Sequence, residues 1–126
     1  MNNIIERTWR QGELGQVDNL TGTAFSAEEK AHTFRIRGED PEGIALAMSG
    51  TVSATFMRSD KTDVTVSGSA SGGVVSLTLS DACYAVKGKF MLTIFLTSGG
   101  QKTAIYAAVG FMTKQRSAFQ PTPPHA

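Results

Sequence analysis

Residues 65–80 read TVSGSASGGVVSLTLS. Apolar and polar residues alternate on both sides of Gly72-Gly73, which is typical of two strands that each bury one face. Two adjacent glycines between such runs predict a two-residue turn of the primed type, because both turn positions need a positive φ. This turn places Ala70 opposite Val75, so the apolar faces of the two strands coincide. The stretch therefore predicts an antiparallel hairpin.

The same alternation extends over most of the chain between residues 33 and 113, interrupted at short intervals by Gly, Ser and Asp. This spacing is typical of an antiparallel β domain. It predicts six strands and a candidate seventh, namely His32–Arg37, Gly50–Arg58, Thr62–Ala70, Val74–Ser80, Lys89–Thr97 and Thr103–Lys114, with Ile4–Arg10 as the seventh.

A second glycine pair, Gly99-Gly100, predicts another two-residue turn in the last hairpin. This turn would place Ile94 opposite Ile105 and Phe90 opposite Val109. Both pairs are apolar, so the expected register buries one continuous face.

The segment Arg58–Thr62 joins two further strands. A two-residue loop at Asp60-Lys61 would pair Phe56 with Thr65, which sets an apolar side chain against a polar one. We therefore expect a loop of about three residues with a bulge.

Between the fourth and fifth strands, Asp81–Val86 breaks the alternation. We expect a single helical turn here, capped by Asp81. Hairpins and a helical corner at intervals of about ten residues are typical of a small sandwich. We predict an all-β fold: a small antiparallel two-sheet sandwich of immunoglobulin-like type over residues 32–116, with an extended N-terminal arm (1–31) and a Pro-rich C-terminal tail (117–126).

The composition limits the classes of partner. The 126 residues carry 12 Lys+Arg and 11 Asp+Glu, so the formal charge of +1 offers no strong field for nucleic acid or an anionic membrane. No stretch approaches the ~20 apolar residues of a membrane span. Residues 1–7 lack the basic start and apolar run of a secretory signal. We expect no nucleic-acid partner, no membrane partner and synthesis in the cytoplasm.

The sequence shows no catalytic constellation. Cys83 is the only cysteine and there are two histidines, which is too few for an internal disulfide or a closed zinc site. We interpret Cys83 as a buried structural thiol and His32 as a hydrogen-bonded residue at the rim of the core. Arg35 and Arg37 lie on the polar face of one strand, but few aromatic residues accompany them for base stacking. We predict a protein that is not an enzyme and has no cofactor and no metal site.

The last expected hairpin is apolar on both faces. The expected core face holds Phe90, Leu92, Ile94, Ile105, Ala107, Val109 and Phe111, and the opposite face holds Met91, Phe95, Tyr106, Ala108 and Met112. A two-layer sandwich needs only one apolar face per strand, so the other must be covered by the N-terminal arm, a second copy or a docking partner. The candidate interface residues are Ile4, Ile5, Trp9, Met91, Phe95, Tyr106 and Met112.

Several stretches of the chain resemble the N-terminal domain of tailed-phage baseplate upper proteins. The resemblance rests on Gly50–Asp60, Val64–Ser69, Val75–Leu79, Cys83–Gly88 and Phe90–Ile94. Two stretches near the start, Glu6–Gly12 and Val17–Gly22, are similar to the beginning of accessory phage virion proteins. The shared motifs are structural: short loops, a glycine turn, a helical corner before a glycine and a long final hairpin.

The resemblance implies a non-enzymatic structural protein of a tailed-phage virion, made in the host cytoplasm. It would dock through its β-sandwich and N-terminal arm onto a symmetric assembly of the baseplate upper or adaptor type. Its partners would be other phage structural proteins, either baseplate or major capsid protein, and further copies of itself in a homo-oligomer on the particle.

Two other functions stay open. Family members usually continue into a coiled coil or a receptor-binding region, whereas this sequence ends in the Pro-rich tail, so a capsid decoration or head-fibre base protein is one alternative. The other is a carbohydrate-binding module, which needs exposed coplanar aromatic rings. Beyond its phenylalanines the chain offers Trp9, Tyr84 and Tyr106 for this role.

Overall fold

The computed structural model describes residues 4–12, 17–21, 25–26 and 32–114. The strands are β1 (Ile4–Arg10), β2 (Asp18–Asn19), β3 (Phe25–Ser26), β4 (Thr33–Glu39), β5 (Thr51–Met57), β6 (Asp63–Ser71), β7 (Val74–Thr78), β8 (Gly88–Ser98) and β9 (Gln101–Lys114). The predicted all-β class is confirmed, and all six expected strands and the seventh candidate are present. The expected Pro-rich tail (117–126) lies outside the described residues.

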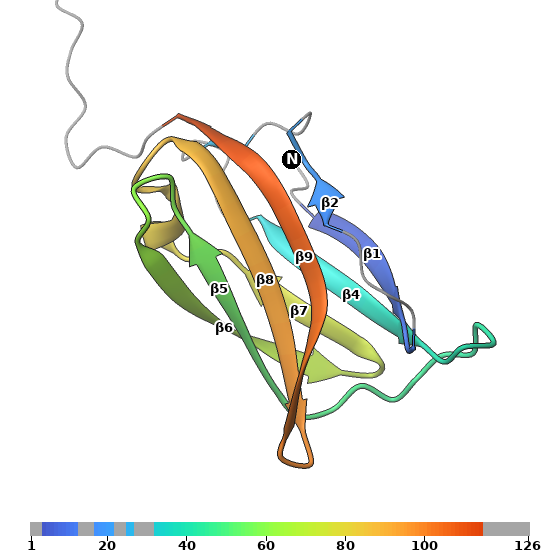
Figure 1. Cartoon of the computed structure of the whole chain (residues 1–126). Helices are drawn as coiled ribbons and strands as arrows, with labels where there is room; N and C mark the ends of the chain where they lie inside the picture. The colour runs from blue at the N-terminus through green and yellow to red at the C-terminus, as the bar shows by residue number, and fades with distance from the viewer. Residues whose placement is uncertain (1–3, 13–16, 22–24, 27–31, 115–126) are drawn as a thin grey trace, which may run out of the picture.

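The strands form one curled sheet in the order β1-β4-β7-β6-β5-β8-β9-β2, with β3 also paired to β9. The layer made by β5, β8 and β9 lies in front of the layer made by β1, β4 and β7 (Figure 1). β6 belongs to both layers, because residues 63–68 pair with β5 and residues 69–71 pair with β7. The fold is therefore a curled half-barrel, and the predicted immunoglobulin-like sandwich of two separate sheets is not confirmed.

Gly68 marks the point where β6 changes partner. A Cβ atom at this position would lie 2.4 Å from the backbone oxygen of Ser76 and 3.0 Å from the Val52 side chain. Only glycine lets β6 approach β7 this closely while it still pairs with β5. The curl of the sheet depends on this close approach.

The predicted two-residue turns at the glycine pairs are confirmed. Ser71 pairs with Val74 around Gly72-Gly73, and Ser98 pairs with Gln101 around the second pair. All four turn glycines have a positive φ, between 60° and 82°. This is the backbone that primed turns require.

The predicted three-residue loop between β5 and β6 is also confirmed. The Arg58 N–H donates to the Thr62 carbonyl at 2.9 Å, and the Lys61 N–H donates to the Arg58 carbonyl at 3.0 Å. Lys61 adopts a φ of 70°, the left-handed residue that follows the type I turn of such loops. This loop aligns Phe56 with Val64, so apolar residues face each other.

The helical corner after β7 is a 3-10 helix, Asp81–Tyr84, as the break in alternation predicts. The expected cap is wrong: Asp81 is the first helical residue, and Ser80 before it makes no side-chain capping hydrogen bond. The Tyr84 hydroxyl accepts the backbone N–H of His32 at 3.0 Å. The corner is thereby tied to the start of β4. Within the described ranges, no helix is long and apolar enough to cross a membrane.

The segment predicted to be an N-terminal arm contributes three strands, and all of them pair in parallel. β1 runs alongside β4, whereas β2 and β3 run alongside β9. Leu20 and Phe25, from this segment, are 2% and 0% exposed and belong to the core. The described part of residues 1–31 therefore packs on the same domain.

The core fills the space between the two layers. Every second residue along the central strands is buried, which is the period expected for a sheet with one face inside. The buried set from these strands comprises Phe34, Ile36, Val52, Ala54, Phe56, Val75, Leu77, Phe90, Leu92, Ile94 and Leu96.

Replacing Gly68 by Ala is expected to destabilise the fold by about 1–3 kcal/mol, because the new methyl group meets backbone that cannot move without breaking the ladder. The matched control is Gly99→Asn. Gly99 also lies in a sheet hairpin, but no atom lies within 4 Å of its ideal Cβ, and Asn tolerates its φ of 60°. Urea unfolding followed by circular dichroism measures both variants. Equal stability of Gly68→Ala and the parent would contradict the role given to this crossing.

Candidate functional site

A β-bulge in β9 decides which side chains of the last hairpin face outward. Phe95 pairs with Ala104, but its neighbour Ile94 pairs with Tyr106, so Ile105 is the extra residue. The predicted pairing of Ile94 with Ile105 is therefore wrong. From the bulge onward the register differs by one residue, which exchanges the two faces of β9.

The bulge brings small residues of β9 under the large ones of β8. Leu92 pairs with Ala108 and Phe90 pairs with Gly110, not with Val109 as predicted. A Cβ at Gly110 would lie 2.7 Å from the Phe90 ring, so the glycine makes room for it. This glycine is the signal in the sequence that could have revealed the shifted register.

A continuous apolar strip lies on the outer face of the β5–β8–β9 layer. We define the apolar strip as Met57, Met91, Val109 and Phe111. Met57 pairs with Met91 and Met91 pairs with Val109, so the three form a row across the strands. Met91 and Phe111 are 42% and 43% exposed, which is unusual for large apolar side chains on neighbouring strands of a sheet.

Two of the candidate interface residues, Met91 and Phe95, do lie on this outer face. Phe95 is half-buried, and the Lys102 ammonium lies 4.5 Å from the centre of its ring. Val109 and Phe111 were assigned to the core by the unbulged register and lie outside instead. No described residue of the segment 1–31 covers the strip, because β2 extends the sheet beside β9 rather than packing on its face.

Two other candidates, Tyr106 and Met112, were predicted to face outward, and this placement is wrong. Met112 is 2% exposed, and Tyr106 packs against the core with its ring 5.7 Å from that of Phe34. The bulge at Ile105 is the physical reason, since it turns both side chains inward.

The last three candidates, Ile4, Ile5 and Trp9, lie on β1. Ile5 and Trp9 are half-buried and pack against the core, while Ile4 is half-buried and pairs with Thr33. Their apolar surface is therefore partly used within the chain. The structure does not bring these three residues together with the apolar strip.

Asp18 links the two ends of the curled sheet. The Tyr106 hydroxyl of β9 donates to Asp18 Oδ2 at 2.5 Å, and Arg7 Nε of β1 donates to the same oxygen at 2.7 Å. β1 and β9 are not paired by backbone hydrogen bonds. This three-residue cluster therefore closes the half-barrel through side chains.

The cluster shifts the ionisation of all three groups. Burial pushes the pKa of Asp18 upward, but the hydrogen bonds from Tyr106 and Arg7 outweigh it, so the pKa lies below its usual value. Burial and the neighbouring carboxylate raise the pKa of Tyr106. The hydrogen bond to Asp18 raises the pKa of Arg7. At neutral pH the cluster holds an ion pair and a neutral phenol.

The structure places the two residues considered for chemistry in the core. Cys83 is fully buried, and burial raises the pKa of its thiol, as expected for a structural cysteine. His32 is 3% exposed, and its Nδ1 lies 2.9 Å from the Tyr84 hydroxyl, so the predicted hydrogen-bonded histidine is confirmed. Among the described residues, no group of three or more His, Cys, Asp or Glu side chains could hold a metal ion.

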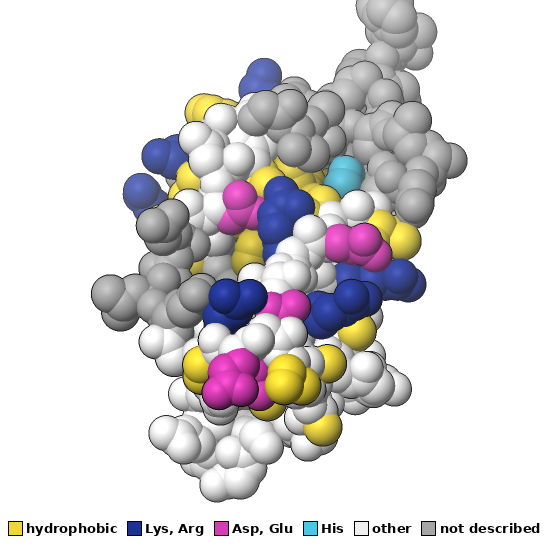
Figure 2. Space-filling view, turned by 90° about the vertical axis from the view of Figure 1, so that its right-hand side faces the viewer, with side chains coloured by type: hydrophobic (Ala, Val, Ile, Leu, Met, Phe, Trp, Pro, Cys, Tyr) yellow, Lys and Arg dark blue, Asp and Glu magenta, His cyan; other side chains and the backbone are white. Residues whose placement is uncertain are grey.

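The side of the molecule that carries β1 differs from the apolar strip. Basic and acidic side chains alternate across the middle of this side (Figure 2). Ion pairs between β1 and β4 on this side include Arg10 with Glu39 at 3.0 Å and Arg35 with Glu6 at 4.0 Å. Exposed pairs of this kind contribute little to stability.

Comparisons with known proteins find similarity at the level of solved structures. No protein-family model and no curated protein matches the chain. Among solved structures, the chain is similar to the N-terminal domain of phage TP901-1 ORF48, with 12% sequence identity and a TM-score of 0.49. The similarity covers 90% of this chain and 98% of that chain.

Replacing Asp18 by Asn is expected to lower stability by about 1–3 kcal/mol at neutral pH, because hydrogen bonds to a charged group are lost. The pKa of Asp18 is lowered in the folded state, so its contribution is present above the unfolded pKa, near 3.8, and is lost as the pH falls further. Thermal unfolding between pH 2.5 and 7 measures this. The Asn variant should lose less stability on acidification than the parent.

The control is Asp63→Asn, an exposed carboxylate at the start of β6 that has no ion pair within the described part of the chain. This variant should lose as much stability as the parent when the pH is lowered from 7 to 2.5. An Asp18→Asn curve that parallels the parent curve down to pH 2.5 would show that the cluster does not hold the sheet ends together.

Proposed function

We propose that this protein is a non-enzymatic structural component of a tailed-phage virion. It docks in repeated copies onto a symmetric assembly of the baseplate upper or adaptor type, and its partner is another structural protein of the particle. The apolar strip on the outer face of β5, β8 and β9 supports the docking part of the proposal. The virion part rests on the resemblance of the sequence to the N-terminal domain of baseplate upper proteins, as expected from the sequence analysis.

The apolar strip is the observation that carries the docking part of the proposal. Interface cores are depleted in charge and enriched in Met and aromatic residues, and a few such anchors usually dominate the binding energy. Met91 and Phe111 meet this description, since both are large, apolar and more than two-fifths exposed. Methionine adapts its shape to a partner, whereas the phenylalanine ring supplies a large rigid contact.

The surroundings of the strip are also suited to an interface. Thr55 and Thr93 pair with each other in the next row of the same face, and Lys89 pairs with Phe111 across the strands. These residues place a polar rim beside the apolar centre, as in typical protein interfaces. The strip lies on paired strands, so the surface needs little ordering before it binds, which lowers the entropic cost of docking.

The double variant Met91→Ala/Phe111→Ala is expected to bind at least about 30-fold more weakly to particles assembled without this protein, since each anchor contributes on the order of 1–2 kcal/mol. Purified protein is added to such particles, and the bound copies are counted after sedimentation. The control is Ile44→Ala, which removes a side chain of 61% exposure in the loop between β4 and β5, away from the strip. If the double variant and the control bind alike, the strip is not the docking surface.

Immunogold labelling of intact particles of the encoding phage, with an antibody against this domain, tests the virion assignment. Gold at the tail tip is the expected result for a baseplate adaptor. Gold on the capsid would replace this role by that of a decoration or head-fibre base protein. Particles without gold would overturn the virion assignment altogether.

A further inference from the structure

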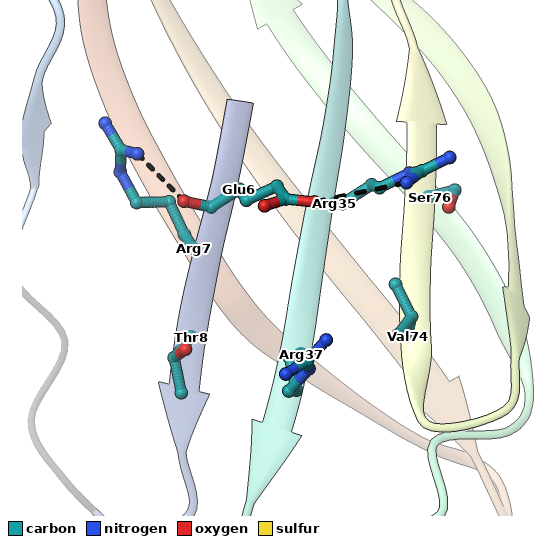
Figure 3. A pocket seen from close by; sticks show the side chains of 7 residues that line it. All are labelled: Glu6, Arg7, Thr8, Arg35, Arg37, Val74 and Ser76. Atoms are coloured by element: carbon teal, nitrogen blue, oxygen red, sulfur yellow. Dashed lines mark hydrogen bonds and ion pairs between the residues drawn. The ribbon is translucent and has the colours of Figure 1, made fainter. Parts of the chain in front are cut away.

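A hollow lies on the outer face of the layer made by β1, β4 and β7, away from the apolar strip. Its volume is about 410 Å³, which is within the usual range of ligand pockets. Side chains from three adjacent strands form its walls (Figure 3). The lining residues are Glu6, Arg7, Thr8, Arg35, Arg37, Val74 and Ser76.

Arginine dominates this lining, but the three guanidinium groups are not equivalent. Arg7 is engaged, because it donates to Asp18 at 2.7 Å and to the Glu6 backbone oxygen at 2.9 Å. Among the described residues, Arg35 forms an ion pair with Glu6, with 4.0 Å between Nη1 and Oε2, and the Glu6 side chain is 73% exposed. Solvent screens this exposed pair, so Glu6 balances the charge of Arg35 only in part.

Arg37 has no ion pair with any described residue of the chain. The next acidic side chain on the same face of β4 is Glu39, and its carboxylate accepts from Arg10 at 3.0 Å. Of the three guanidinium groups that line the hollow, that of Arg37 is therefore the one without a carboxylate partner among the described residues. Two guanidinium groups on one strand face repel each other, and an anion between or above them would remove this repulsion.

The spacing of the two arginines points to a particular kind of anion. Arg35 and Arg37 are two residues apart on β4 and share a face, so their attachment points are about 6.5–7 Å apart. An extended peptide with acidic residues at alternate positions presents its carboxylates at the same interval. Each guanidinium fork matches one carboxylate with two parallel hydrogen bonds.

The other lining residues suit a peptide as well. Thr8 lies beside Arg37 and Ser76 lies beside Arg35, and their hydroxyl groups can donate to or accept from a peptide backbone (Figure 3). Val74 supplies an apolar contact on the other side of Arg37 from Thr8. A single small anion would accept hydrogen bonds from the guanidinium group of one arginine only, unless both arginine side chains bent toward it.

We propose that this hollow binds an extended acidic protein segment with two carboxylates at alternate positions, one held by Arg35 and the other by Arg37. The site is separate from the apolar strip, and its ligand does not depend on the role in a virion. In the complex, the exposed arginines of β4 form ion pairs with the carboxylates of the ligand, and the core does not change.

The test is a nuclear magnetic resonance titration of the full chain with two blocked peptides, one containing Glu-Thr-Glu and the other Gln-Thr-Gln. The acidic peptide should shift the amide signals of Thr8, Arg37 and Ser76 in a saturable way, and the neutral peptide should not. Raising the salt concentration from 50 to 300 mM should weaken binding, because the contacts are exposed ion pairs. Inorganic phosphate serves as the small-anion comparison.

Three variants sharpen this test. Arg37→Gln should weaken binding of the acidic peptide about 10-fold, which corresponds to ~1.4 kcal/mol. Arg37→Lys keeps the charge but not the fork, so it should fall between Arg37→Gln and the parent. The matched control is Lys102→Gln, which removes a positive charge beside Phe95 on the other layer and should leave binding unchanged.

Four results would overturn the proposal. They are the absence of shifts at the hollow, equal binding of the Gln-Thr-Gln peptide, undiminished binding by Arg37→Gln, and the same shifts with phosphate at lower concentration than with the acidic peptide. The last result would make the hollow a site for small oxyanions instead. Because the arginines are exposed, replacing them should not change the unfolding temperature. Measuring this temperature for each variant checks that the fold is intact.

Discussion

The double pairing of β6 is the constraint on which the rest of the structure depends. One half of this strand is bonded to β5 and the other half to β7, so the backbone ladder itself bends the sheet into two facing layers. The bend needs a position without a side chain where β6 passes the Ser76 carbonyl, and Gly68 supplies it. The core, the two outer faces and the distance between the sheet ends all follow from this curl.

A half-barrel leaves two strand edges that must be protected from further pairing. Here the N-terminal segment does this by adding β1 at one end of the sheet and β2 and β3 at the other. Leu20 and Phe25 then fill the core beside these edges, and Asp18 joins the two ends through Arg7 and Tyr106. The strands β1, β2 and β3 thus complete the two ends of the sheet.

The two outer faces differ in chemistry because different strands form them. On β8 and β9, both faces of the hairpin are apolar, and the outer one exposes Met91 and Phe111. On β4, the inward residues are apolar and the outward ones include Arg35 and Arg37. One face is suited to a large dry contact, and the other is suited to an anionic segment. The two proposed binding surfaces therefore lie on different layers of the fold.

The sequence by itself determined the class of the fold, the positions of seven of the nine strands in the described residues and the geometry of three turns. These features are local: alternation sets the buried face of a strand, and the paired glycines and Arg58–Thr62 admit few backbone conformations. The sequence also showed that the last hairpin is apolar on both faces.

The sequence also identified the inward face of β8, but only the tertiary structure decided which residues of β9 point inward. In β9 either register buries apolar residues, so the hydrophobic pattern cannot choose between them. The choice is made by packing: the bulge at Ile105 sets Ala108 and Gly110 under Leu92 and Phe90, where larger side chains would collide. The parallel pairing of the N-terminal strands could not be predicted from the sequence either. It depends on contacts between residues far apart in the chain, and the alternation of apolar and polar residues does not specify these contacts.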